Sequence, residues 1–555
     1  MKTRLLAASA LVISTVLAIE PVFAQTATNQ NNVNQTGSTN TAAVDNTRTG
    51  NTYDVSTIVQ NGVSNTASVL QIGNFNSSYD SQIGNTNYAG TSQEGNAHRA
   101  ETYQTSNSNR SVIRQNDVAN SATVTQGGLR NLSMIAQGAE AGASQDYDTT
   151  TFFSASSTVR AGQNNRSSIS QVGNDFTSTV RQRARSGGQA ADDNRVVVRQ
   201  RGGGNSSTIV QDSRGNSASV YQLEGGASDA LRNVTSVTQS NTAATAASNP
   251  QTGNMVNVAA AGQANSALVM QDGLSNSAEV TQGLGIGSSV QISQVGSAGI
   301  NRAAIAQYGD TNAVVIGQNA AGATATVWQQ AGPASARSSN NTVVVQQGTG
   351  TTGADAFSAS YFGGGAGTTG AAANGLSANV TQGNNPGAAS WNIAQIRQDG
   401  TNLAATIQQF GSGTAANANI ARIAQQGNAN SATEIQRAGV GSATSSAVPT
   451  GQAGDAYYFA GGIRSAEAAI LQSGSNNSAT IEQRGQSQYA RIEQGPGGAN
   501  TASILQDTSA AFATAIIRQT GNNNTYAVNQ DTANSYVLVS QTGNGNTVTD
   551  IIRRP

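Results

Sequence analysis

Side chains that commonly carry catalysis or bind metals are scarce in this sequence. Its 555 residues include no cysteine and one histidine, His98, and only 10% of them are charged. The lack of cysteine excludes disulfides, thiolate zinc sites and cysteine nucleophiles, and a single histidine argues against a Ser-His-Asp triad or a histidine-ligated metal. The 28 basic and 29 acidic residues leave a net charge of −1. This balance argues against nucleic acid as a partner, because nucleic acid requires a concentrated basic face.

Two short motifs have the form of ligand sites but lack the context that such sites need. Residues Gly365–Gly370 match G-x-G-x-x-G, yet the motif follows no hydrophobic strand and opens no apolar-periodic helix, as a dinucleotide site would. The acidic run Asp146–Asp148 has no calcium-binding repeat around it. No recurrent cluster of carboxylates is visible either. We therefore predict that the protein is not an enzyme, and we assign no catalytic, cofactor-binding or metal-binding residue.

The chemistry that the sequence does offer is hydrogen bonding by side-chain amides. Between positions 60 and 137, Gln occurs only at eight positions spaced 11 residues apart. Five residues after most of them comes Asn, seven residues after comes Ala or Ser, and two residues after usually comes Gly. The unit Q-x-G-x-x-N-x-[AS]-x-x-x-Q then recurs towards the C-terminus. The amides that we predict to form a structural ladder are Gln60, Asn65, Gln71, Asn76, Gln82, Asn87, Gln93, Gln104, Asn109, Gln115, Asn120, Gln126, Asn131, Gln137, Gln271, Asn276, Gln282, Gln472, Asn477 and Gln483.

The spacing within a unit predicts a strand followed by a turn. From Asn120 to Gln126 the two amides share one face with Ala122 and Val124, while Ser and Thr occupy the other. This period-two alternation is typical of a half-buried strand. The following x-G-x-x segment is expected to be a turn, because glycine tolerates positive φ. Two units make one 22-residue coil. We therefore predict an all-β fold, a β-solenoid of stacked strand–turn–strand coils interrupted by Gly/Ala/Ser-rich loops.

Stacking of such coils places identical inward amides above one another. Strands of successive coils pair about 4.8 Å apart, so Gln and Asn can hydrogen-bond along the stack. An unpaired buried amide costs about 1–3 kcal/mol, which predicts nearly continuous columns. Asp80 and Glu434 fall at inward places, and we interpret them as weakened coils or units of misjudged register. His98 occupies an Asn place. We interpret it as a neutral hydrogen-bonding substitute rather than a pH switch.

The chain divides into three parts by composition. Residues 1–24 are predicted to be a signal peptide, with Lys2 and Arg4 before an apolar stretch and an A-x-A-like site at Val22–Ala24. No later segment is expected to span a membrane. Residues 25–59 are a polar N-terminal segment with degenerate repeats, and residues 60–555 the repeat solenoid. Insertions rich in small residues lie near 138–159, 223–232, 348–376 and 437–465, and they are interpreted as loops or as linkers between repeat blocks.

The repeat unit resembles the curlin repeat, the motif of the secreted subunits of curli, the amyloid fibres of bacterial biofilms. Residues Gln60–Gln71, their many copies and the signal peptide carry this resemblance. It implies a structural fibre subunit, major or minor, at the extracellular cell surface, which self-associates or joins related subunits or a nucleator for adhesion and biofilm formation. Residues 25–46 are similar to the part of curlins implicated in passage through an outer-membrane secretion channel. The chain departs from the family in its greater length and in its insertions.

Other functions are compatible with a β-solenoid. The main alternative is a monomeric surface adhesin or carbohydrate-binding protein, whose insertions cap the ends or bind a ligand. Arginines on the polar face form a solvated surface that limits strand pairing, or contact acidic polysaccharide. An ice-binding or polysaccharide-degrading solenoid is less well supported, because no Thr-x-Thr face recurs in register and no catalytic cluster is visible.

Overall fold

A computed structural model describes most of the repeat-bearing chain. The described residues are 29–48, 53–138, 163–183, 193–212, 214–223, 232–240, 253–283, 285–296, 300–329, 340–348, 375–383, 391–410, 418–437, 466–485 and 487–552. Within these ranges there are strands and turns and no α-helix, so none of the described segments is a helix suited to crossing a membrane. The predicted signal peptide lies outside these ranges, and the predicted insertions fall almost wholly outside them.

The chain forms two units, residues 1–255 and residues 256–555. The strands of the first unit are β1 Gln30–Ser38, β2 Thr41–Arg48, β3 Val55–Val63, β4 Thr66–Asn74, β5 Ser77–Ile83, β6 Tyr88–Asn96, β7 Arg99–Gln104, β8 Arg110–Val118, β9 Ser121–Gly127, β10 Leu132–Gln137, β11 Arg166–Asn174, β12 Thr177–Arg183, β13 Arg195–Gly203, β14 Ser206–Asp212, β15 Ser217–Leu223 and β16 Val234–Ser240.

The second unit contains all of β17 except its first residue. Its strands are β17 Met255–Ala261, β18 Ser266–Gly273, β19 Ser277–Gln282, β20 Ser289–Gly296, β21 Arg302–Gln307, β22 Ala313–Asn319, β23 Thr324–Gln329, β24 Thr342–Gly348, β25 Ser377–Gln382, β26 Asn392–Thr401, β27 Ala404–Gln409, β28 Asn419–Asn428, β29 Ser431–Gln436, β30 Ala466–Ser475, β31 Ser478–Gln483, β32 Gln488–Gln494, β33 Thr501–Gln506, β34 Thr514–Thr520, β35 Thr525–Gln530, β36 Tyr536–Thr542 and β37 Thr547–Ile552.

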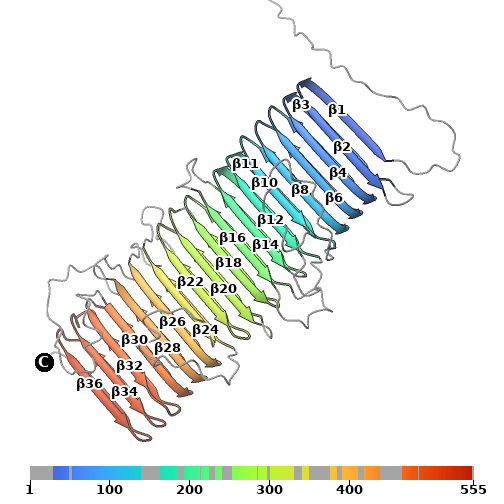
Figure 1. Ribbon diagram of the computed structural model, residues 1–555. Coiled ribbons are helices and arrows are strands. Elements are labelled where there is room, and N and C mark those ends of the chain that lie inside the picture. Colours follow the sequence, from blue (N-terminus) through green and yellow to red (C-terminus); the bar gives the residue numbers. More distant parts are fainter. Residues whose placement is uncertain are drawn as a thin grey trace, which may run out of the picture. The chain divides into compact units, whose positions relative to one another are not determined.

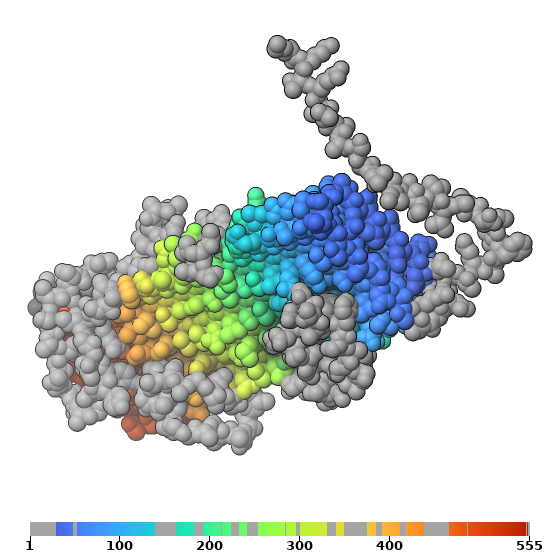
Figure 2. Space-filling model, turned by 45° about the horizontal axis from the view of Figure 1, so that its top comes forward, coloured from blue at the N-terminus to red at the C-terminus, as the bar shows by residue number. Residues whose placement is uncertain are grey.

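Within each unit the chain alternates between two parallel sheets, which we call the odd sheet and the even sheet after their strand numbers. Each strand pairs with the next strand but one, as β3 does with β5 and β4 with β6. The register superposes equivalent residues, so Gln60 lies beside Gln82 and Gln71 beside Gln93. Figures 1 and 2 show successive coils of each unit in the order of the sequence. The β-solenoid of two-strand coils predicted from the 11-residue period is confirmed.

The glycine of the repeat is required by a close approach between turns. Gly62 has a φ of +134°, and a Cβ placed there would lie 1.8 Å from the carbonyl oxygen of Gly84 in the next coil. The same contact joins Gly73 to Gly95. Because backbone meets backbone at this position, any side chain would push neighbouring coils apart. The stacking distance of the strands therefore selects glycine in the turn.

The core is a thin layer between the two sheets. Burial alternates along each strand, as in β9, where Ala122, Val124 and Gln126 are fully buried and the residues between them are not. The first strands follow the same pattern of pairing, since β1 pairs with β3 and β2 with β4 in register. The polar segment before residue 60 thus contributes strands to both sheets.

Candidate functional site: the interior amide rows

Rows of glutamine run through each sheet of each unit. In every row the Nε2 of one Gln donates to the Oε1 of the Gln in the following coil, for example over 2.8 Å from Gln60 to Gln82 and 2.7 Å from Gln71 to Gln93. In the first unit the odd row is Gln35, Gln60, Gln82, Gln104, Gln126, Gln171, Gln200 and Gln222. The even row is Gln71, Gln93, Gln115, Gln137, Gln182, Gln211 and Gln239.

The second unit contains two corresponding rows. Its odd row is Gln282, Gln307, Gln329, Gln382, Gln409, Gln436, Gln483, Gln506 and Gln530. Its even row is Gln271, Gln294, Gln318, Gln347, Gln398, Gln425, Gln472, Gln494, Gln519 and Gln541. The rows continue across long stretches of sequence, as from Gln329 to Gln382 over 2.7 Å.

Both hydrogens of a row amide are used. While Gln82 Nε2 donates to Gln104, it also donates to the carbonyl oxygen of Thr66, 3.0 Å away at the start of the preceding strand. Thr66 belongs to the even sheet and Gln82 to the odd sheet, so each amide joins neighbouring coils and also the two facing sheets. This pairing satisfies both donors of a fully buried amide, which would otherwise lose its hydrogen bonds to water.

Asparagine columns secure the start of each strand. The Oδ1 of Asn65 accepts the backbone N–H of Asn87 in the next coil over 3.0 Å. Its Nδ2 donates to the carbonyl oxygen of Gly84 over 2.8 Å. The Asn side chain therefore fixes both the following strand and the turn before it, which explains why the amide occurs at the junction of turn and strand.

All twenty predicted ladder amides are buried, with no more than 1% of their surface exposed. Gln60, Gln82, Gln104 and Gln126 share the odd row of the first unit, and Gln71, Gln93, Gln115 and Gln137 share its even row. In the second unit Gln282 and Gln483 belong to the odd row, and Gln271 and Gln472 to the even row. Asn65, Asn87, Asn109 and Asn131 form one column before strands of the even sheet, and Asn76, Asn120, Asn276 and Asn477 occupy the same position before strands of the odd sheet.

His98 reproduces the bonding of the Asn that it replaces. Its Nδ1 lies 3.3 Å from the backbone nitrogen of Asn120 and its Nε2 lies 3.2 Å from the carbonyl oxygen of Glu94. A neutral ring protonated at Nε2 accepts the first hydrogen bond and donates the second. Burial lowers the pKa of His98 by penalising its charged form. This geometry agrees with the interpretation of His98 as a neutral substitute for an amide.

Two inward carboxyl groups stand where most strands carry an aliphatic residue. Asp80 is fully buried beside Ile58, and the hydroxyl of Thr91 in the facing sheet lies 3.3 Å from its Oδ1. Burial raises the pKa of Asp80 to about 7. Glu434 lies between Ile407 and Ile481, and burial raises its pKa well above the usual range. The spacing had given the correct register for both residues, so the alternative of a misjudged register was wrong.

The Asn columns are less uniform than the repeat predicts. In the odd sheet of the second unit, Ala323, Leu376 and Leu403 occupy the Asn place in successive coils and form an apolar cluster with Ala320. In the first unit Phe176 takes the Asn place and is completely buried. The sequence does place an apolar residue immediately before each of these strands, but the repeat unit does not indicate that such residues pack on one another.

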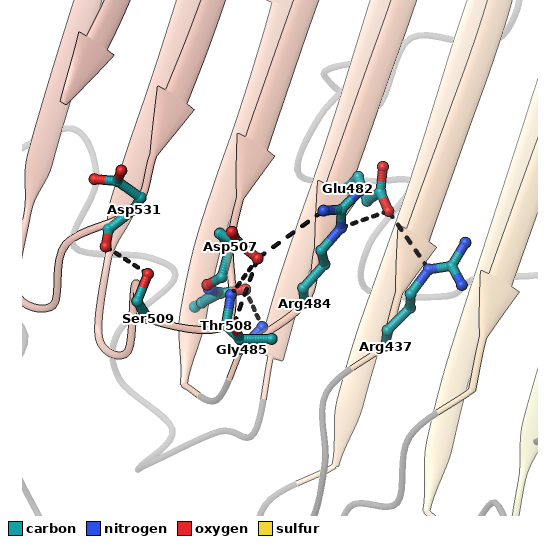
Figure 3. Close-up of polar contacts among 9 residues, drawn as sticks. Arg437, Glu482, Arg484, Gly485, Asp507, Thr508, Ser509 and Asp531 are labelled. Atoms are coloured by element: carbon teal, nitrogen blue, oxygen red, sulfur yellow. Dashed lines mark hydrogen bonds and ion pairs between the residues drawn. The ribbon is translucent and has the colours of Figure 1, made fainter. Parts of the chain in front are cut away.

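The outward face of the odd sheet carries exposed ion pairs. Figure 3 shows Glu482 between two arginines, with its Oε1 3.4 Å from Arg437 and 2.9 Å from Arg484. Arg484 also lies 3.9 Å from Asp507 on the next loop. Pairs this exposed contribute little to stability. In the ranges that the structure describes, no three acidic or histidine side chains come together as a metal site would require.

Comparison with known proteins identifies the repeat. A family model described as the curlin associated repeat matches residues 191–223, 262–296, 465–495 and 474–507. The matches fall in both units and cover strand pairs whose Gln residues belong to the rows described above. No curated protein matches the chain.

Proposed function

We propose that this chain, which carries repeats of the curlin family, is a structural subunit of extracellular curli-like amyloid fibres that serve adhesion and biofilm formation. Its stacked coils are a short piece of cross-β structure, with parallel strands in register and rows of identical amides. A coil at the end of such a stack has unpaired backbone groups and an unfinished Gln row, which another coil of the same repeat can continue. The related subunits or a nucleator, and an outer-membrane secretion channel, are the partners that this function requires.

The observation that carries the proposal is the continuous hydrogen bonding of the Gln rows, which begin at Gln35 and Gln71 in the first unit and at Gln282 and Gln271 in the second. These rows contain no binding or catalytic group, and each Gln of a row offers its neighbour the same donor and the same acceptor. Such a surface recognises another coil of the same repeat. Edge-to-edge addition would therefore extend the rows by the contacts that already join one coil to the next.

The direct test uses the mature chain from Gln25 onwards. We expect the purified protein to form fibres that bind thioflavin and give a meridional reflection near 4.8 Å, the spacing of paired strands. Unseeded and seeded reactions should be followed together, because addition to an existing end is faster than formation of a new one. A protein that stays monomeric in both reactions and gives no cross-β reflection would contradict the proposal.

A surface adhesin for acidic polysaccharide is the second candidate, and a group of exposed arginines favours it. Arg166 and Arg195 lie side by side on β11 and β13, and Arg199 lies further along β13. None of the outward positions on β9, β11, β13 and β15 carries a carboxylate. Neighbouring like charges of this kind are unfavourable unless an anion lies between them. Binding of monomeric protein to polygalacturonate but not to neutral dextran, lost in Arg166→Ser/Arg195→Ser, would support this function.

A further inference from the structure

The first strand of the chain continues the inward pattern of the repeat. In β1 the inward residues Asn31, Val33 and Gln35 pair in register with Ser56, Ile58 and Gln60. Gln35 Nε2 donates to Gln60 Oε1, which makes Gln35 the first member of the odd row. All residues of β1 are exposed. Its inward residues are those that another coil of the repeat would cover.

The last strand breaks the same pattern at two places. In β37, Asp550 is paired with Val528 and Ile552 is paired with Gln530. The odd sheet thus ends with a carboxylate at the aliphatic place and an aliphatic residue at the Gln place. The even sheet ends differently, because Gln541 on β36 still belongs to its row.

A tyrosine of the preceding coil lies near the exceptional carboxylate. Burial and the neighbouring Asp550 carboxylate raise the pKa of Tyr526 on β35. Tyr526 is 2% exposed and stands at an inward place where the preceding strand has Ala502. The change at the C-terminal end therefore involves two successive strands of the odd sheet.

These substitutions oppose the addition of another coil on β37. An incoming strand would enclose Asp550 between aliphatic neighbours, where an ionised carboxylate is poorly solvated. Every row donates from Nε2 towards the C-terminal side, so the Gln Oε1 of the incoming strand would face Ile552 and find no donor. A buried acceptor without a donor weakens the joint further.

We propose that β37 is a cap, and that this chain joins curlin fibres through its N-terminal end. Its preferred partner is another curlin-repeat chain whose last strand keeps Gln at the row position and an aliphatic residue two places before it. A second copy of the same chain is a weaker partner, because its β37 carries Asp550 and Ile552, so fibres of this chain alone should grow slowly. The inference rests on the proposed function and adds to it an orientation and a choice of partner.

The test restores the repeat at the C-terminal end. Fibres of the mature Asp550→Val/Ile552→Gln variant, sheared into seeds, expose an uncapped end. We expect fluorescent variant monomers to extend these seeds faster than wild-type monomers by about tenfold or more, because each wild-type monomer that adds leaves Asp550 and Ile552 at the growing end. Thr549→Val, an outward change on the same strand, should behave as the wild type does.

A change at the N-terminal end tests whether the chain adds to fibres through β1. The double substitution Val33→Asp/Gln35→Ile places the same cap on β1. A chain that carries only these two changes should not add to the seeds at all. Wild-type monomers that extend the seeds as fast as the uncapped variant would overturn the cap but leave the fibre function intact. Failure of every variant to form or extend fibres would overturn both.

Discussion

At the scale of the residue, two ionisable side chains stand at inward places of the first unit, where burial favours their neutral forms. Asp80 on β5 and His98, just before β7, lie in neighbouring coils, and each interrupts a different column. Burial acts on both by penalising charge, which raises the pKa of the carboxyl and lowers that of the imidazole. The two residues should consequently make the stability of these coils depend on pH in opposite directions.

Protonation of His98 should loosen the strand that follows Asn120. As the pH falls below the ordinary value near 6.5 and through the lowered pKa, the folded state must accept a proton on a buried ring, and Nδ1 can then no longer accept from the Asn120 N–H. We expect protection of that amide from hydrogen exchange, corrected for the intrinsic rate, to decrease. In His98→Asn the protection should be independent of pH between 4 and 7, and an equal decrease in both proteins would contradict this prediction.

Asp80 should have the opposite effect. Its folded pKa of about 7 lies above the unfolded value of 3.8. Its contribution to stability is therefore complete below pH 4 and is lost as the pH rises through 7, with a limiting cost on the order of 4 kcal/mol. After correction for the intrinsic rate, exchange from the amides of β5 and β6 should accelerate in the wild type as the pH rises from about 4 to about 7. Asp80→Val should remove this dependence, while the exposed control Asp45→Asn should retain it.

Removing one row amide should leave two polar groups unsatisfied. In Gln115→Ala the Nε2 of Gln93 loses its acceptor and the Oε1 of Gln137 loses its donor. We expect a loss of roughly 2–5 kcal/mol in local unfolding free energy and slower fibre growth. Thr123→Ala, on an outward position of β9, should change stability by less than about 0.5 kcal/mol. Urea denaturation and thioflavin kinetics measure the two effects, and unchanged values for Gln115→Ala would show that the row does not stabilise the stack.

At the scale of the element, the sequence predicted the fold best at positions where the structure accepts only one kind of residue. The period of 11 predicted strand, turn and inward amide because hydrogen bonding and backbone contact allow few substitutes. The Asn place is more permissive, since the apolar residues Leu376 and Leu403 can pack on each other when they occur in successive coils. The sequence alone does not indicate this contact, because the two leucines are 27 positions apart and a strand of the even sheet lies between them.

Two adjacent glycines differ in whether the fold requires glycine at their position. Gly128 has a φ of +104°, and a Cβ there would lie 2.0 Å from the carbonyl oxygen of Gly173. At Gly127 the nearest atom would be 3.6 Å away. We expect Gly128→Ala to destabilise the fold by more than about 2 kcal/mol and Gly127→Ala by less than about 1 kcal/mol. Urea midpoints compare the two variants, and equal midpoints would show that the turns can separate.

At the scale of the whole molecule, each coil contacts only its neighbours, so stability should be nearly additive along each unit. The first unit offers an internal test, because the 22 residues from Arg110 to Asn131 form one complete coil, with Gln115 and Gln126 in the two rows. Their deletion joins Asn109 to Leu132 and preserves the repeat.

We expect the protein lacking this coil to keep its β-sheet circular dichroism and to unfold at nearly the same urea concentration. A deletion of 16 residues, from Arg110 to Thr125, should disrupt folding. It joins Asn109 directly to Gln126, so an Asn of the strand-start column is followed at once by a Gln of a row and the repeat is broken. If both shortened chains behave alike, the register of the rows is not what holds the coils in place.

The common direction of the Gln amides gives each row an electrical polarity. Side-chain dipoles that point the same way add rather than cancel, as peptide dipoles do in a helix. In the second unit the N–H groups of both rows point towards the last coil, which concentrates partial positive charge there. The carboxylate of Asp550 sits close to this terminus. The same aspartate that discourages a further strand therefore compensates the field of the amides behind it, much as an acidic residue does at the start of a helix.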